Sequence, residues 1–358
     1  MKPHKILVIN PGSTSTKIAV FENERAIFSE NIKHSAEELS IFGYIIYQHK
    51  FRKELILHKL EEAKIDISQI EIIVGRGGLI KPVLSGVYEM NDRLKEDLRK
   101  GVQGEHASNL GGLIADDIAK LIPNAKAYIA DPVVVDELQD VARITGHPKI
   151  LRTSIFHALN QKSVARRFAK SVGERYENLN LIVAHLGGGI SIGAHLKGKV
   201  VDVNNGLDGD GPFSPERAGS LPSGALVKLC FSNKYTHEDV KKMLVGNGGL
   251  IALMGTNEAK DVEILADKGD ERAKLIQDAM CYQIGKYIGA MATVLKGRVD
   301  GIIITGGIAH NKYLCNYVGE MVQFIASVQV YPGEDEMAAL AINGLMILNG
   351  ELQPIIYE

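Results

Sequence analysis

Short apolar runs that end in glycine-rich loops recur along the chain and predict buried strands. Residues 70–74, 181–184 and 302–305 are rich in β-branched side chains, and glycines follow each of them. Glycine at a strand end lets the backbone approach a ligand closely. Between these runs, the helical spacing of apolar residues predicts helices over 154–171 and 270–295, with Thr153 or Ser154 capping the first. The alternation of strands and helices indicates an α/β architecture.

One pattern occurs twice. Residues 5–21 and 181–196 each show an apolar strand, a turn of small residues and a second alternating strand, and Asn10 aligns with His185, 175 residues further along. Either any strand–glycine–strand hairpin produces this likeness, or the chain holds two similar domains that present glycine turns to one shared cleft. No linker marks a boundary, and we expect a first domain over 1–152 plus 335–358 and a second over 153–334.

Composition narrows the class of protein. The 41 Lys and Arg residues against 43 Asp and Glu residues give a net charge of −2, which argues against a nucleic-acid partner. No apolar run approaches the ~18 residues of a membrane span, and the first apolar stretch is too short for a signal-peptide core. Cys230, Cys281 and Cys315 are too far apart for a disulfide framework or paired metal-binding motifs. A reduced, cytoplasmic enzyme is the expectation.

The glycine loops do not match two common nucleotide motifs. Gly-Lys occurs only before Val200 and Tyr287, so a P-loop is absent. After Gly187–Gly189, Ile192 stands where a dinucleotide fingerprint needs glycine, and the chain continues as a strand, which opposes a dehydrogenase. A hairpin turn whose backbone N–H groups and small hydroxyls bind phosphate oxygens fits both loops.

The hairpin residues carry a resemblance to a known family. Residues 6–17 resemble the first signature of the acetate and butyrate kinases, residues 181–198 resemble the second, and residues 300–311 resemble the adenosine loop. Residues 74–78 and 211–219 are closest to the pattern of the butyrate kinases. The family belongs to the actin-like ATPases, so the resemblance implies two ribonuclease-H-like domains with a nucleotide cleft between them.

The resemblance implies reversible, in-line transfer of the ATP γ-phosphoryl group to the carboxylate of butyrate, with Mg²⁺ as cofactor and butyryl phosphate and ADP as products. A carboxylate is already ionised at neutral pH, so the barrier is repulsion between two anions and not deprotonation. Partners would be a short-chain acid, an adenine nucleotide and further copies of the chain in a homodimer or larger oligomer. Oligomer size and direction of flux stay open.

By resemblance, four residues are catalytic. Arg76 and Arg217 lie in glycine-rich loops, where a guanidinium can grip a carboxylate or phosphoryl group with two hydrogen bonds. His157 follows Phe156 as in the family and would stabilise the transferring phosphoryl group. Asp131 ends a strand before a proline and would orient an arginine or a metal-bound water.

Other residues are assigned to cofactor and substrate. Mg²⁺ would be held by Asn10 and by Glu336 or its neighbour Asp335. Nucleotide contacts would come from a set in the glycine loops: Asn10, Ser13, Ser15, Lys17, His185, Gly187, Gly188, Gly189, Gly306, Gly307, Ile308 and Asn311. The loop over 255–261 would add to the same pocket.

The substrate pocket would include His106 and Gly75. Acetate kinases have an aliphatic residue at the position of Gly75, so glycine would enlarge the pocket for a longer acid. Each buried CH₂ contributes at most about 0.8 kcal/mol, so selectivity would be graded and straight and branched acids are not separable. The alternatives are a kinase for isobutyrate, propionate or acetate, and a non-catalytic actin-like switch that binds ATP.

Overall fold

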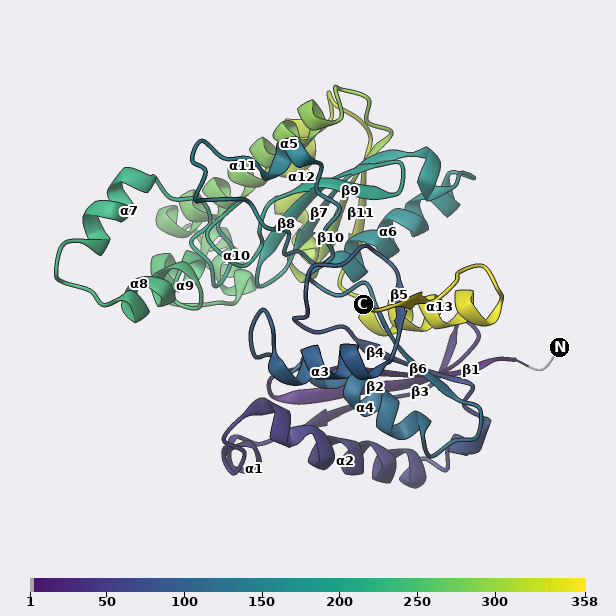
Figure 1. Ribbon diagram of the computed structural model, residues 1–358. Coiled ribbons are helices and arrows are strands. Elements are labelled where there is room, and N and C mark those ends of the chain that lie inside the picture. Colours follow the sequence, from purple (N-terminus) through teal and green to yellow (C-terminus); the bar gives the residue numbers. More distant parts are fainter. Residues whose placement is uncertain (1–2) are drawn as a thin grey trace. The chain divides into compact units, whose positions relative to one another are not determined.

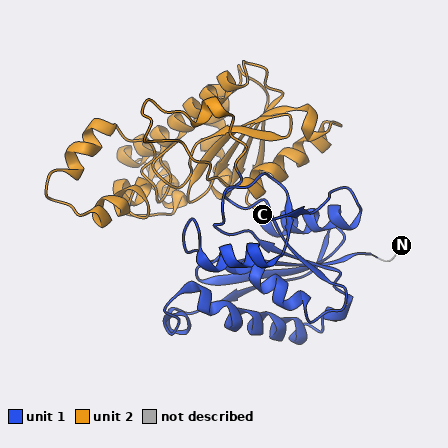
Figure 2. Ribbon diagram, viewed as in Figure 1, with its two compact units in different colours: residues 1–135, 335–358 blue, residues 136–334 orange. Residues whose placement is uncertain are grey.

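The computed structural model describes residues 3–358, and these form two compact units (Figure 2). Unit 1 runs to Val135 and includes Asp335–Glu358, while unit 2 is Asp136–Glu334. The first two residues of the predicted first domain lie outside the described residues. The chain thus leaves unit 1 once and returns to it with its last helix (Figure 1).

The passage into unit 2 comes earlier than the sequence placed it. Residues 136–152 belong to unit 2, where Glu137 pairs with Lys162 at 2.8 Å and Arg152 pairs with Asp202 at 2.9 Å. These ion pairs involve side chains distant in sequence, so no local pattern marks the boundary.

Unit 1 is built on a seven-stranded sheet in the order β12-β5-β6-β4-β1-β2-β3. Its strands are β1 (Lys5–Pro11), β2 (Ser15–Glu22), β3 (Arg25–Lys33), β4 (Ile72–Arg76), β5 (Val87–Glu89), β6 (Lys126–Ala130) and β12 (Ile355–Ile356). Its helices are α1 (Ala36–Ser40), α2 (His49–Glu62), α3 (Asp92–Lys100), α4 (Asn109–Ala119) and α13 (Glu336–Leu348), with short 3-10 turns at Ile45–Gln48 and Ile67–Gln69.

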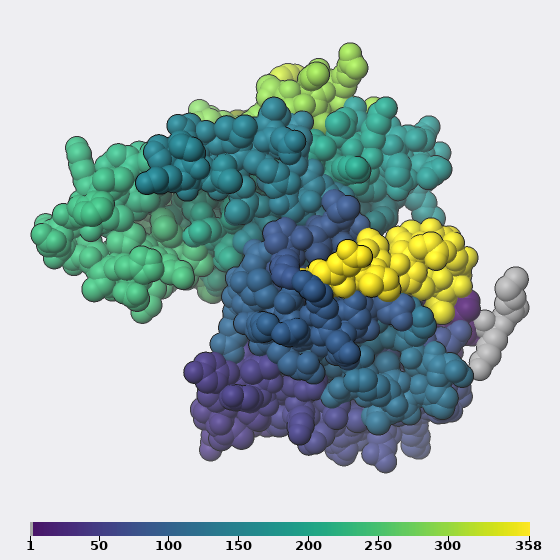
Figure 3. Space-filling view, viewed as in Figure 1, coloured from purple at the N-terminus to yellow at the C-terminus, as the bar shows by residue number. Residues whose placement is uncertain are grey.

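Both faces of this sheet are covered, which explains why β1 and β4 are apolar without alternation. On one face, Leu7 and Ile9 of β1 belong to the same apolar cluster as Ile114 of α4. α13 packs against β1 and β4. Gly344 of α13 allows this close approach, because a Cβ atom there would lie 2.9 Å from a methyl of Val74. The C-terminal segment therefore forms part of the surface of unit 1, shown in yellow in Figure 3.

Unit 2 contains a five-stranded sheet in the order β11-β10-β7-β8-β9. Its strands are β7 (Asn180–Leu186), β8 (Ile190–Leu196), β9 (Lys199–Val203), β10 (Gly301–Gly306) and β11 (Val328–Pro332). Its helices are α5 (Asp140–Arg143), α6 (Ala158–Ser171), α7 (Ser223–Cys230), α8 (His237–Leu244), α9 (Gly249–Met254), α10 (Ala259–Asp267), α11 (Glu271–Val294) and α12 (Lys312–Val322), with 3-10 turns at Tyr176–Asn178 and Gly307–His310.

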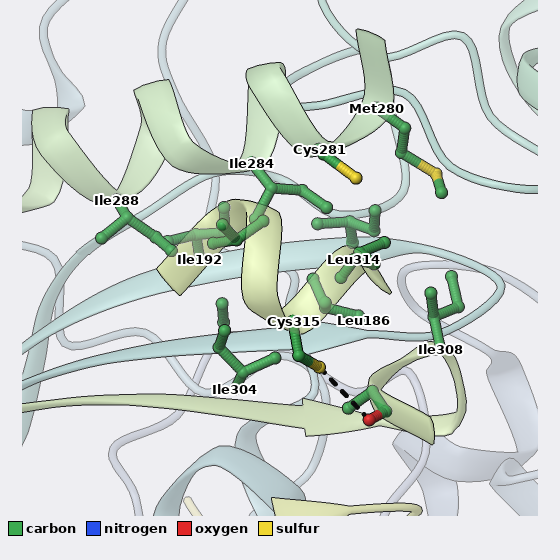
Figure 4. Packing of buried hydrophobic residues seen from close by; sticks show 14 of the residues in the cluster. Leu186, Ile192, Met280, Cys281, Ile284, Ile288, Ile304, Ile308, Leu314 and Cys315 are labelled. Carbon is green, nitrogen blue, oxygen red and sulfur yellow. Dashed lines mark hydrogen bonds between the residues drawn. The ribbon is translucent and has the colours of Figure 1, made fainter. Parts of the chain in front are cut away.

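The main core of unit 2 lies between the sheet and helices α11 and α12. Ile284 and Ile288 of α11 face Ile192 and Ile304 of the sheet, with Leu314 of α12 in the same cluster (Figure 4). A second cluster joins α6 to the sheet, where Phe168 packs with Leu181 and Ile303. Among residues 3–358, no helix combines the length and apolar character needed to cross a bilayer.

The internal repeat is confirmed. β1 and β7 each pair antiparallel with the next strand and parallel with β4 or β10, so β3-β2-β1-β4-β6 matches β9-β8-β7-β10-β11. β1 and β7 have equal length and begin 175 residues apart, at Lys5 and Asn180. The chain therefore holds two α/β units of like topology.

Two helix starts can be compared with the sequence. Asp270 caps α11 as predicted, since its Oδ1 accepts from the Ala273 N–H at 2.9 Å. The helix predicted from Ser154 begins instead at Ala158, with the His157 side chain as its cap. The structure thus gives His157 a fixed place at the start of α6.

Candidate functional site

The β1–β2 turn gathers the polar residues predicted to bind phosphate in unit 1. The Gly12 N–H donates to the Ser15 carbonyl at 2.7 Å, which leaves Ser13 exposed at the tip. Asn10 and Lys17 are directly opposed across the hairpin, so their side chains point to the same face of the sheet. Asn10, Ser13, Ser15 and Lys17 therefore lie at one end of one hairpin, where backbone and hydroxyl donors can meet an anion.

Three of the predicted residues form a cluster at this end of the sheet. Asn10 Nδ2 donates to Glu336 Oε2 at 2.5 Å, and Arg76 Nη1 lies 3.1 Å from Glu336 Oε1. Arg76 Nη1 is also 3.4 Å from Asn10 Oδ1. Asp335 faces elsewhere, because its Oδ1 caps α13 by accepting from the Ala338 N–H at 3.0 Å.

This cluster suits a hard divalent cation. It offers one carboxylate, from Glu336, and one amide oxygen, from Asn10, both buried. Mg²⁺ usually takes one or two protein carboxylates and completes its shell with phosphates and waters. The donor set would suit Mg²⁺, and of the two acidic candidates it is Glu336, and not Asp335, that contacts Asn10.

Asp131 and His106 lie in the same unit with partners of their own. Asp131 has a left-handed backbone with φ of 37°, and its Oδ1 accepts from Ser85 Oγ at 2.6 Å and from the Gly86 N–H at 2.9 Å. These bonds fix the loop that leads into β5. Loss of hydration around the ring, together with the Arg76 cation, lowers the pKa of His106. His106 is therefore a neutral ring close to Arg76 at neutral pH.

The space beside Gly75 is filled by helix α4. A Cβ atom on Gly75 would lie 2.7 Å from Gly112 N and closer still to the Gly111 backbone. Gly111 in turn would place a Cβ atom 2.9 Å from Arg76 N. The glycine thus serves the packing of β4 against α4, and the α4 backbone occupies the space where a side chain at this position would lie.

In unit 2, the glycine turn after β7 holds Arg217. A Cβ atom on Gly189 would overlap the Arg217 guanidinium, so only glycine leaves room for it. Arg217 Nη1 donates to the Gly206 carbonyl, and burial lowers the pKa of Arg217 against the opposing charge of Glu216. Ser214 Oγ donates to the Gly188 carbonyl at 2.6 Å and so fixes the position of the turn.

His157 and His185 lie side by side, with Glu334 between their outer nitrogens. Their ring centroids are 4.4 Å apart, and Glu334 lies 3.1 Å from His185 Nε2 and 3.7 Å from His157 Nε2. Burial alone would raise the pKa of Glu334, but hydrogen bonds from both histidines outweigh it and hold that pKa well below its usual range. Glu334 is therefore an anion.

The ring of His185 is held by two neighbouring side chains. His185 Nδ1 lies 2.8 Å from Asn160 Oδ1, and its Nε2 faces the Glu334 carboxylate. These contacts fix the ring next to the Gly187 turn.

A cavity of about 750 Å³ opens beside this cluster, and a drug-sized ligand or nucleotide fits such a volume. It brings together Gly187, Gly188, Gly307, Ile308 and Asn311 from the predicted nucleotide set with the loop at 257–260. Its full lining is Gly187, Gly188, Pro215, Glu216, Asn257, Glu258, Ala259, Lys260, Glu263, Gly307, Ile308, His310, Asn311 and Glu334. Gly306 lies behind it with φ of 94°, packed on the Leu186 backbone.

Sequence reasoning missed three residues of this site. Asn160 contacts His185, and Ser214 contacts Gly188. Glu334 contacts both His157 and His185. Asn160 lies one helical turn after His157, which is a signal that could have found it. Glu334 precedes the acidic pair at 335–336, and nothing in that short acidic run marks it as a partner of histidines.

Comparison with known proteins adds to this picture. The model of the Acetokinase family matches residues 144–331. Butyrate kinase 1 of Clostridium acetobutylicum is 56% identical over 97% of this chain and 98% of its own, and Butyrate kinase 2 of that organism is 56% identical over 97% of each.

Solved structures share the fold at low sequence identity. The acetate kinase of Porphyromonas gingivalis superposes with a TM-score of 0.81 at 21% identity, covering 96% of this chain and 100% of its own. The propionate kinase of Francisella tularensis has a TM-score of 0.76 at 19% identity, covering 95% and 98%. With the family model and relatives of 56% identity in agreement, this chain belongs to the acetokinase family.

Proposed function

We propose that this protein is a butyrate kinase, which transfers the γ-phosphoryl group of ATP to the carboxylate of butyrate in a reversible reaction. The observation that carries the proposal is the 56% identity, over 97% of the chain, to two proteins named butyrate kinase. Phosphoryl transfer to a carboxylate needs positioning and positive charge and no base, and the residues of both units suit that need.

The nucleotide would lie in the cavity of unit 2. Gly187 and Gly188 line it on one side and Gly307, Ile308 and Asn311 on another, so backbone N–H groups can meet phosphates while the loop after β10 contacts the nucleoside. Gly187 is next to Glu334 and His185, since a Cβ atom there would lie 3.0 Å and 3.1 Å from their side chains. The phosphates would therefore meet the histidine pair.

Arg217, His157 and His185 would stabilise the negative charge that develops on the phosphoryl group during transfer. Arg217 is held over the Gly189 turn, and the Nε2 atoms of both His157 and His185 face the Glu334 carboxylate. Cationic and hydrogen-bond-donating groups placed at the developing charge would stabilise a transferring phosphoryl group. Glu334 acts through the histidines as a positioning residue.

Unit 1 would provide the acid-binding and metal-binding groups. Arg76 and His106 suit a carboxylate substrate, while Asn10 and Glu336 would hold Mg²⁺. Mg²⁺, when bound, neutralises charge on phosphate oxygens. Ser13, Ser15 and Lys17 would contact phosphate from the β1–β2 turn, and Asp131 would keep the loop at 85–86 in place. The use of Mg²⁺, a cytoplasmic location and assembly into a homo-oligomer complete the proposal.

The test is trapping of the acyl phosphate. The protein is incubated with ATP, Mg²⁺ and butyrate, and butyryl phosphate is captured with hydroxylamine while ADP is measured in parallel. We expect equal amounts of hydroxamate and ADP. ADP release that does not depend on any acid, with ATP still bound, would contradict the proposal and favour an actin-like switch.

A further inference from the structure

Arg52 of α2 is the most deeply buried arginine that the proposed reaction does not use. Its side chain is 1% exposed, and it reaches the inner side of the β1–β2 turn. Nη1 donates to the Gly12 carbonyl at 2.8 Å and to the Ser15 carbonyl at 3.1 Å, and Nη2 donates to the Ser13 carbonyl at 3.3 Å. One guanidinium therefore binds three backbone carbonyls of the turn.

The remaining donors of Arg52 meet neutral groups as well. Nη1 also reaches Thr16 Oγ1 at 3.0 Å, while Nε and Nη2 both donate to Gln48 Oε1, at 3.1 Å and 2.8 Å. Within residues 3–358, no carboxylate lies at ion-pair distance from Arg52. Burial lowers the pKa of Arg52 to about 10, so the group is cationic at neutral pH.

An uncompensated buried charge is costly. Removing an ion from water carries a large free-energy penalty even after the surroundings relax, and neutral hydrogen-bond acceptors recover only part of it. The outer side of the same turn presents the exposed Ser13 and Thr14. An anion seated there would be separated from the guanidinium only by the turn backbone, in a region of reduced dielectric where charges attract strongly.

We propose that Arg52 is a positioning residue that holds the Gly12–Thr16 turn in its anion-binding shape, and that its missing countercharge is a phosphate group bound on the outer side. This inference deepens the proposed function and rests on it. The phosphate can belong to ATP or to the acyl phosphate, since both carry the same group.

The decisive variant changes Gln48. Gln48→Glu is nearly isosteric, keeps an oxygen against Nε and Nη2 of Arg52, and supplies the missing negative charge from within the protein. We expect KM for ATP, for butyryl phosphate or for both to rise about tenfold, which is the effect of cancelling one nearby unit charge. KM for butyrate should change less than twofold and the melting temperature should not fall.

Two controls separate charge from structure. Gln48→Met removes the same hydrogen bonds without adding charge and should lower the melting temperature with a smaller effect on KM. Lys53→Gln removes a positive charge from the same helix, where Lys53 pairs with Asp117 at 3.8 Å, and should leave both KM values as they are. Arg52→Lys, which keeps the charge and loses the planar fork, should raise KM for the phosphate ligands more than for butyrate.

Separate KM measurements for ATP and for butyryl phosphate identify which of the two ligands places its phosphate on the Gly12–Thr16 turn. A rise confined to ATP places the nucleotide on the turn, and a rise confined to butyryl phosphate places the acyl phosphate there. Wild-type KM values for both ligands in Gln48→Glu would overturn the inference while leaving the proposed function intact. If the wild type transfers no phosphoryl group, the shift in melting temperature caused by ATP or inorganic phosphate tests Arg52 independently.

Discussion

Gly75→Ala tests whether the missing side chain in β4 serves packing or substrate choice. The sequence favoured an enlarged acyl pocket, whereas the structure places the α4 backbone there. The new Cβ atom would lie 2.7 Å from Gly112 N and closer to Gly111, and Cβ contacts under 3.0 Å essentially never occur. Both neighbours are backbone atoms, so no flexible side chain can move aside.

The expected cost follows from what has to shift. α4 packs on β4, β6 and α2, and its Leu110 and Ile114 lie in the main cluster of unit 1. Overpacking of this kind costs about 1–3 kcal/mol, occasionally more, and we expect the upper end because α4 moves as a whole. In a unit of this size, about 3 kcal/mol corresponds to a fall of about 6–12 °C in melting temperature.

The assay is thermal and urea unfolding of the wild type, Gly75→Ala and a matched control. Gly43→Ala serves as control, because nothing lies within 4 Å of its Cβ position in the same unit. The control should melt as the wild type does. If Gly75→Ala also melted like the wild type and its preference moved from butyrate toward acetate, the packing argument would be refuted and Gly75 would border the acyl pocket.

Three further predictions concern charge. Arg217→Ala should lower kcat about 100-fold to 1,000-fold, the usual effect of losing one preorganised donor, while ATP still raises the melting temperature; near-normal kcat would remove Arg217 from the mechanism. Glu336→Gln should raise the Mg²⁺ concentration needed for half-maximal rate about tenfold or more, and an unchanged Mg²⁺ curve would exclude Glu336 as a ligand. Burial, and then Arg52, lower the pKa of His34 from 6.5 to about 4, so its contribution of about 3 kcal/mol is present above pH 6.5 and is lost as pH falls toward 4. Urea unfolding of His34→Gln should show a flatter pH dependence over that range, and a profile parallel to the wild type would contradict this.

Local chemistry made much of the fold predictable. Strands β4, β7 and β10 stand out as β-branched runs before glycine, and Asp270 is a standard helix cap. The likeness of the two hairpins survives folding because β1 and β7 have the same neighbours in their sheets. These features depend on residues close together in sequence, which a pattern can show.

The rest depends on contacts between distant segments. Glu334 meets His157 and His185 only when β11 lies beside β10 and β10 beside β7. Glycine is needed at position 75 because the α4 backbone packs against it. Unit 2 begins earlier than the sequence indicated because Glu137 and Arg152 form ion pairs with residues of unit 2. Neither spacing nor composition carries such information.

The site predictions divide in the same way. The glycine turns stand out in the local sequence, and the family resemblance points to Asn10 and His185 beside them; the structure places both near the ends of central strands. The choice between Asp335 and Glu336 needed the helix geometry, since only the first residue of α13 faces Asn10. The roles of these residues in catalysis stay predictions until variants are measured.

Butyrate as the substrate is best tested by comparing kcat/KM for acyl phosphate formation from acetate, propionate, butyrate, isobutyrate and valerate at identical ATP and Mg²⁺ concentrations. We predict a maximum at a four-carbon acid, with neighbouring lengths reduced by graded factors, because each CH₂ contributes at most about 0.8 kcal/mol. A maximum at acetate or propionate would contradict butyrate as the substrate while keeping a carboxylate kinase. Formation of no acyl phosphate from any of the five acids would contradict the account as a whole.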